Sequence, residues 1–131
     1  DAHCTSTGKL LLAYLPDDRL ETLLSGWDLP RRTPHTIHDP AVLRAELRAI
    51  RERGWAGNVQ EVEMGASSIA APIRNGLGEV IAAVSVAGSM QKLNAESMKR
   101  FARPCVDAGL AISRRLGFRD GPAAMRRSDG R

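Results

Sequence analysis

Cysteines and aromatic residues are scarce in this sequence, and long hydrophobic runs are missing. The 131 residues include two cysteines, Cys4 and Cys105, and aromatic side chains make up 4% of the chain. So few cysteines favour reduced, partly buried thiols over a disulfide framework, which fits a cytoplasmic location. No run reaches the roughly 18 apolar residues of a membrane span, and the first residues lack the pattern of a signal peptide. We therefore expect no membrane partner, and the absence of an initiator Met predicts that the piece was cut from a longer chain.

Charge is distributed unevenly. The formal net charge is +4 at pH 7, but most of the excess lies near the C-terminus, and both signs are mixed before residue 114. A basic end with few aromatic residues is typical of a solvated segment, so we do not expect this piece to bind DNA itself. A composition of 43% hydrophobic and 26% charged residues is typical of a soluble globular domain. We assign residues 1–118 to one domain and residues 119–131 to a flexible basic tail.

Residues 66–87 alternate in hydrophobic character on both sides of Asn75, Gly76 and Gly78, which predicts a β-hairpin. With the turn centred between Gly76 and Leu77, one face of the ribbon is bulky and the other carries small side chains. The bulky face requires a core, whereas the small face either accepts a closely packed helix or leaves space for a ligand, and the sequence alone does not separate these alternatives. The expected pairs are Ile73 with Val80, Ala71 with Ala82 and Ile69 with Val84 on the bulky face, and Ala70 with Ala83, Ser68 with Ser85 and Ala66 with Ala87 on the small face.

Four helices and a further strand are predicted around the hairpin. Helices are expected at residues 5–15, 17–25, 40–53 and 95–116, and the strand at residues 55–63. Apolar residues recur at spacings of three and four in the last helix, which predicts one buried stripe, and Pro104 predicts a bend. These elements give an α+β domain with helices on at least one face of a three-stranded sheet; because three strands are few, we expect partner strands before residue 1. The buried stripe is expected to consist of Met98, Phe101, Cys105, Gly109, Ile112 and Leu116.

Several residue pairs resemble catalytic or metal-binding motifs without completing them. His3 beside Cys4 suggests a thiol nucleophile and its base, but adjacent residues on an extended segment point apart. His35 and His38 resemble half of a metal site that no further Cys or His cluster completes. Glu61 begins a Glu-x-Glu pair that fits a wet sheet edge, or Glu61 serves as an internal hydrogen-bond anchor. We expect no catalytic residue, metal or cofactor, and the alternative is a small hydrolase or thiol enzyme that uses Cys4 with a histidine.

The run Ser6-Thr7-Gly8-Lys9 lies at a predicted helix start, where free backbone N–H groups and the helix dipole attract a carboxylate or phosphate. A simple capping role explains one Ser or Thr, whereas the additional small residues also suit close approach by a small anion. If this helix start faces the small side of the hairpin, Ser68, Ser85 and Asn58 supply further polar contacts. Such a site binds a ligand without reacting with it.

The residues in this order resemble the effector-binding domain of the IclR family of bacterial transcription regulators, over about residues 2–118. No single motif is decisive, but many occur in the same order. They are His3-Cys4-Thr5-Ser6-Thr7-Gly8-Lys9 with Leu11-Leu12-Ala13, Thr33-Pro34-His35-Thr36-Ile37, Arg51-Glu52-Arg53-Gly54-Trp55 with Glu61, Ser68-Ile69-Ala70-Ala71-Pro72-Ile73-Arg74, Gly78, Ala82-Ala83-Val84-Ser85-Val86-Ala87-Gly88 and Ile112-Ser113-Arg114-Arg115-Leu116-Gly117.

This resemblance implies a GAF-like antiparallel sheet flanked by helices that binds a small organic effector, commonly a carboxylate or aromatic acid. It also implies dimers or tetramers, and DNA binding only through an N-terminal winged helix-turn-helix that this piece lacks. Asn58 stands where an acidic residue is frequent, and Ala87 where a second serine is frequent. The hydroxyl missing at Ala87 favours a bulkier or more apolar effector over a glyoxylate-like one. The implied effector-binding residues are Ser6, Thr7, Asn58, Ala66, Ser68, Ser85 and Ala87.

Overall fold

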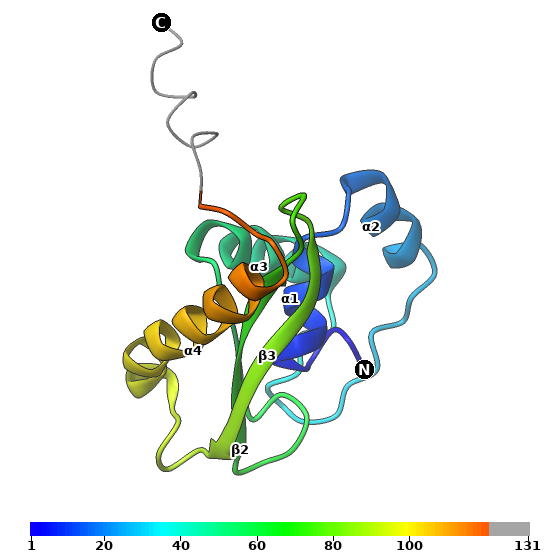
Figure 1. The fold of residues 1–131 in the computed structure, drawn as a ribbon. Coiled ribbons are helices and arrows are strands. Elements are labelled where there is room, and N and C mark those ends of the chain that lie inside the picture. The colour runs from blue at the N-terminus through cyan, green and yellow to red at the C-terminus, as the bar shows by residue number, and fades with distance from the viewer. Residues whose placement is uncertain (121–131) are drawn as a thin grey trace, which may run out of the picture.

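A three-stranded antiparallel sheet lies between two layers of helices (Figure 1). The computed structural model describes residues 1–120, so the predicted tail lies outside the described residues from 121 onward. Helix α4 covers one face of the sheet, and α1, with α3 behind it, covers the other. The α+β prediction is therefore confirmed. The elements are α1 (Ser6–Ala13), α2 (Asp17–Leu24), α3 (Pro40–Arg53), β1 (Ala56–Val59), β2 (Ala66–Arg74), β3 (Val80–Ser89) and α4 (Ala95–Arg115).

Capping residues fix the helix ends close to their predicted positions. The Asp39 side chain accepts a hydrogen bond from the Ala41 amide at 2.8 Å, with Pro40 in the first turn of α3. That helix stops at Gly54, whose φ of 83° lies in the left-handed region. Asn94 caps α4 through the amides of Glu96 and Ser97. None of the helices in residues 1–120 has the length and apolar character needed to cross a membrane.

The first strand is shorter than predicted. Expected at residues 55–63, it ends at Val59, and Gln60 adopts a φ of 57°, which takes the chain out of the extended conformation. The Asn58 side chain then accepts the amide N–H of Glu61 at 2.8 Å, so a side chain replaces the next bond of the ladder. The loose alternation of residues 55–63 predicted a strand that continues through this turn, which the Asn58 side chain stabilises.

The predicted register of the hairpin is wrong by two residues. Ser68 lies opposite Ala87, and Ile69 lies opposite Val86, with an irregularity beside Arg74. The cause is a longer loop, in which the Asn75 carboxamide accepts the amides of Leu77 and Glu79 at 2.9 and 3.0 Å. Since side chains alternate with a period of two, a shift of two residues leaves the paired side chains from Ala66 to Ile73 on their predicted faces. Beyond the irregularity, Val80 lies opposite Arg74 and not opposite Ile73 as predicted.

The two faces of the hairpin bury different cores. Ala70 belongs to a core with residues of α1 and α3, including Leu10 and Leu47. Ile69 belongs to a separate core with Met98 and Cys105 of α4. The bulky face thus packs on α4, and the small face accepts α1 over part of its length.

Helix α4 buries three residues of the predicted stripe, Met98, Cys105 and Gly109, but not the other three. Phe101, Ile112 and Leu116 are 43%, 39% and 50% exposed, because the helix is rotated so that smaller residues face the sheet. At Gly109 the helix touches the backbone of β2: an added Cβ would lie 2.6 Å from the Pro72 carbonyl oxygen. Pro104 lies within one continuous helical segment. The buried residues of α4 are Met98, Ala102, Cys105, Gly109 and Ser113.

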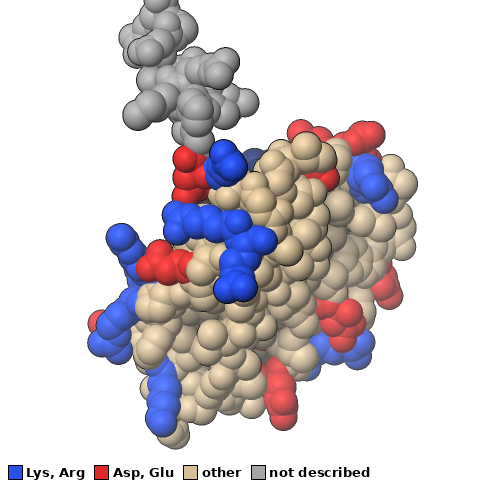
Figure 2. Space-filling view, viewed as in Figure 1, with Lys and Arg blue, Asp and Glu red and all other residues tan. Residues whose placement is uncertain are grey.

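Charged side chains on the face seen in Figure 2 gather over α4, where Lys and Arg outnumber Asp and Glu. The neighbouring surface over β3 carries few charges in this view. Val86 and Ile81 of β3 are 55% and 52% exposed. This side of the molecule therefore presents a basic helix beside a largely uncharged strand.

Candidate functional site

The first turn of α1 points at the small face of the hairpin. The Ser6 and Ser68 hydroxyl oxygens lie 2.7 Å apart and share a hydrogen bond, and Ser6 is 2% exposed. Thr5 is the N-cap, and its hydroxyl oxygen accepts the Gly8 amide at 3.0 Å. The first amides of a helix have no helical acceptor, so those of Ser6 and Thr7 are not used within α1. The helix start therefore faces the small side of the hairpin, which was the condition for Ser68 and Asn58 to lie near it.

Asn58 completes a polar cluster with the two serines. It lies opposite Ser68 in the β1–β2 ladder and is 7% exposed. Its side-chain amide donates to the Ser68 hydroxyl at 3.4 Å, while its carbonyl oxygen holds the Glu61 amide. Asn58 is therefore fixed by the turn after β1 and presents an N–H group to the hydroxyl pair.

Of the remaining predicted site residues, Ala66, Ser85 and Ala87 lie on the same face of the hairpin, and Thr7 lies in the first turn of α1. Ala87 is the partner of Ser68 on β3, and Ser85 is the partner of Ala70. Ser85 and Ala87 are exposed, whereas Ala66 and Thr7 are half-buried. Because Ala70 is fully buried under α1, the helix covers one end of the small face and leaves the other end open. One part of the small face is therefore packed against a helix, and another part remains a free surface.

Gly8 has a packing role that the sequence did not indicate. A Cβ atom at Gly8 would lie 2.4 Å from the Ala2 Cα atom and 2.5 Å from the Ala2 carbonyl oxygen. Glycine is therefore needed for the close packing of the N-terminal segment on α1, and this packing accounts for Gly8 without a ligand.

A buried ion pair beside this cluster was not foreseen. The Lys9 side chain is 2% exposed, and its Nζ atom lies 2.8 Å from Glu61 and 3.6 Å from Glu46. Burial raises the pKa of the Glu61 carboxyl group, and the charge of Lys9 opposes that rise. The Glu61 Oε1 atom is buried without a hydrogen-bond partner among residues 1–120. Glu61 thus serves as the internal anchor considered above, but no periodicity connects a lysine with a glutamate 52 positions later.

Residues 1–114 match the family model described as bacterial transcriptional regulator IclR C-terminal. The chain belongs to this family. It is 38% identical over 115 residues to the Pca regulon regulatory protein of Pseudomonas putida, a match that covers 88% of this chain and 38% of that protein. The IclR C-terminal domain described here therefore spans less than half the length of that curated relative.

Solved structures of IclR-type regulators share the fold. The crystal structure of Thermotoga maritima IclR superposes with a TM-score of 0.83 at 35% sequence identity, covering 90% of this chain and 48% of that chain. A double mutant of the PobR inducer-binding domain from Acinetobacter, crystallised with 3-hydroxybenzoic acid, superposes with a TM-score of 0.77 at 28% identity. That match covers 88% of this chain and 65% of the PobR chain.

The surroundings of Cys4 in this IclR domain do not support a thiol enzyme. Cys4 is fully buried, and burial raises the pKa of its thiol, which disfavours the nucleophilic thiolate. The neighbouring His3 uses Nε2 to contact the Pro30 carbonyl oxygen at 2.7 Å. No group of three potential metal ligands occurs within residues 1–120, so His35 and His38 remain an incomplete pair there. The matched relatives are transcriptional regulators, which are not enzymes.

Proposed function

We propose that this IclR C-terminal domain binds a small organic acid, aromatic or otherwise bulky, between the start of α1 and the open end of the small hairpin face. The contact between the Ser6 and Ser68 hydroxyls carries the proposal, because it directs a helix N-terminus at a surface bearing small side chains. The complex of the related PobR inducer-binding domain with 3-hydroxybenzoic acid supports the choice of an aromatic carboxylate.

Each residue of the proposed site has a distinct role. The amides and hydroxyls of Ser6 and Thr7 bind the carboxylate, and Ser68, Ser85 and Asn58 bind other polar atoms of the ligand. Ala66 and Ala87 leave space for its body. Since Ala87 offers a methyl group opposite Ser68, this part of the site favours apolar atoms over another hydrogen-bonding group.

Ligand binding acts on transcription through the rest of the regulator. Within the whole protein, which we place in the cytoplasm, the domain self-associates to a dimer or tetramer and a winged helix-turn-helix outside residues 1–131 contacts DNA. An effector with different affinities for two arrangements of that oligomer shifts the balance between them, and with it DNA binding. No bond of the ligand is made or broken.

Titration calorimetry with a panel of small carboxylates and aromatic acids tests the site. A ligand that binds the wild type is expected to lose most of its affinity in Ser68→Leu, because the larger side chain fills the space beside Ser6. Ser25→Leu is the matched control, since Ser25 is exposed at the end of α2, on a separate element. Circular dichroism confirms that each variant is folded. Equal affinity for the wild type and Ser68→Leu would show that the ligand binds elsewhere.

A further inference from the structure

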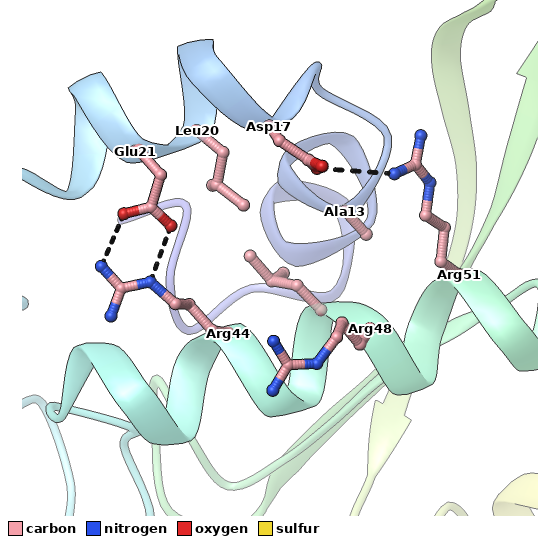
Figure 3. Close-up of a pocket in the computed structure, with 8 residues that line it drawn as sticks. Ala13, Asp17, Leu20, Glu21, Arg44, Arg48 and Arg51 are labelled. Atoms are coloured by element: carbon pink, nitrogen blue, oxygen red, sulfur yellow. Dashed lines mark hydrogen bonds and ion pairs between the residues drawn. The ribbon is translucent and has the colours of Figure 1, made fainter.

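A second concave surface lies between α2 and α3, away from the serine cluster. It has a volume of about 270 Å³ and lies at the end of α1 opposite to Ser6. Its floor is apolar, and its rim is charged (Figure 3). Its lining residues are Ala13, Leu20 and Leu47 on the floor, and Asp17, Glu21, Arg44, Arg48 and Arg51 on the rim.

The rim has one more positive than negative side chain. Arg44 forms a two-pronged ion pair with Glu21, with nitrogen to oxygen distances of 2.8 and 2.7 Å. Arg51 reaches Asp17 at 3.9 Å, which is a weaker contact. Arg48 lies between them on α3, one helical turn from each, and its guanidinium has no hydrogen bond or ion pair with any residue among 1–120 (Figure 3). The two ion pairs bridge α2 to α3 on both sides of this unpaired guanidinium.

The shape and charge of this pocket suit an amphipathic anion. A guanidinium such as that of Arg48 donates two parallel hydrogen bonds to a carboxylate or phosphate. The acidic side chains are engaged by Arg44 and Arg51, so they do not neutralise Arg48. Below the rim, the side chains of Leu20 and Leu47 offer an apolar surface to the body of the ligand.

We propose that the pocket between α2 and α3 is a second binding site, which takes a small oxyanion, carboxylate or phosphate, attached to an apolar body, with Arg48 as its main ligand. The site is independent of the one at Ser6 and Ser68 and does not require that one to bind anything.

Methyl-resolved NMR separates the two sites, because Leu20 and Leu47 line this pocket directly and are not among the residues of the proposed site at Ser6 and Ser68. Benzoate and phenyl phosphate serve as probes, inorganic phosphate supplies the charge alone and benzyl alcohol the apolar body alone. We expect saturable shifts of these methyl signals with benzoate or phenyl phosphate and smaller responses to either partial probe. Comparison of the two full probes identifies the preferred oxyanion. Stronger binding in low salt is also expected, since the pocket is at the surface.

Arg48→Ala should weaken the binding of the responding probe about fivefold, near the upper limit for an exposed ion pair. Arg48→Lys should recover part of the loss, because lysine keeps the charge without the two-pronged geometry. Arg103→Ala removes the same charge from α4 and should change affinity by less than about twofold. The proposal is refuted if neither full probe shifts the Leu20 and Leu47 methyls, if both alanine variants weaken binding equally, or if benzyl alcohol binds as well as the anions. These expected outcomes are the same whether or not a ligand binds at Ser6 and Ser68.

Discussion

Replacing Lys9 with methionine removes the charge that partners a buried carboxylate while keeping a side chain of similar length. At 2.8 Å, the attraction between Lys9 and Glu61 is about 6 kcal/mol for an effective dielectric constant of about 20. The cost of removing two charges from water offsets part of this attraction in the folded protein. Lys9→Met leaves the Glu61 carboxylate buried without its partner, a change that typically costs about 3 to 5 kcal/mol. We therefore expect the free energy of unfolding to fall by about that amount near neutral pH.

The loss should be smaller in acid. Burial raises the pKa of Glu61 in the folded state, so the folded protein holds its proton to a higher pH than the unfolded chain does. The contribution of Glu61 to stability is then most favourable below its ordinary pKa and declines as pH rises through the raised value. Without Lys9 the pKa rises further, so the penalty of Lys9→Met should grow between about pH 5 and about pH 7.5.

Urea denaturation of the wild type and Lys9→Met at both pH values measures this effect. Adding Glu61→Gln to Lys9→Met should restore much of the stability, because no buried charge is left unpaired. Arg44→Met is the matched control, since it breaks a well-formed ion pair with Glu21 at the surface and should change stability far less. The reasoning is refuted if Lys9→Met costs no more than the surface control, or if its cost is independent of pH.

Three further outcomes follow from single contacts. Gly109→Ala should destabilise the fold by about 1 to 3 kcal/mol in thermal unfolding, because the added Cβ meets the backbone of β2. Gly88→Ala adds a Cβ in open space and should have little effect. Equal effects of the two variants would contradict the close packing of α4. Cys4 should react with iodoacetamide at neutral pH only as the protein unfolds, since its thiol is buried and its pKa is raised. Fast selective labelling of Cys4 in the folded protein would support the thiol-enzyme alternative. Ala87→Ser should shift the preference in calorimetry toward small oxo-acids and away from bulky aromatic acids, and an unchanged preference would place Ala87 outside the site.

The helix boundaries were largely readable from the sequence because local chemistry decides them. Asp39 with Pro40, Gly54 and Asn94 act through their own backbone neighbours, and each was found where it was predicted. The faces of the hairpin were also correct from Ala66 to Ile73, since they depend only on alternation. The register was not, because the side chain of Asn75 organises a longer loop than the two glycines suggest.

The face that α4 buries could be read only in part from hydrophobic periodicity, which predicted Met98, Cys105 and Gly109 correctly. Phe101 and Ile112 fit an apolar stripe as well as any residue in the helix, yet Ala102 and Ser113 face the sheet. Close contact with β2 at Gly109 decides the rotation, because only small side chains fit where a helix touches a backbone. Such a contact depends on the partner surface, which is not encoded in the helix itself.

The candidate site, like the fold, was only partly predictable from the sequence. The sequence alone determined which residues belong to the small face, that a helix starts at Ser6, and which family the residues resemble. Only the tertiary structure decided that this helix start meets Ser68 and Asn58, that Gly8 packs on Ala2, and that Lys9 and Glu61 form a buried pair. The physical reason is range: capping and alternation act between neighbours in the chain, whereas hydrogen bonds and ion pairs across 52 to 62 positions exist only once the sheet and α1 have packed together.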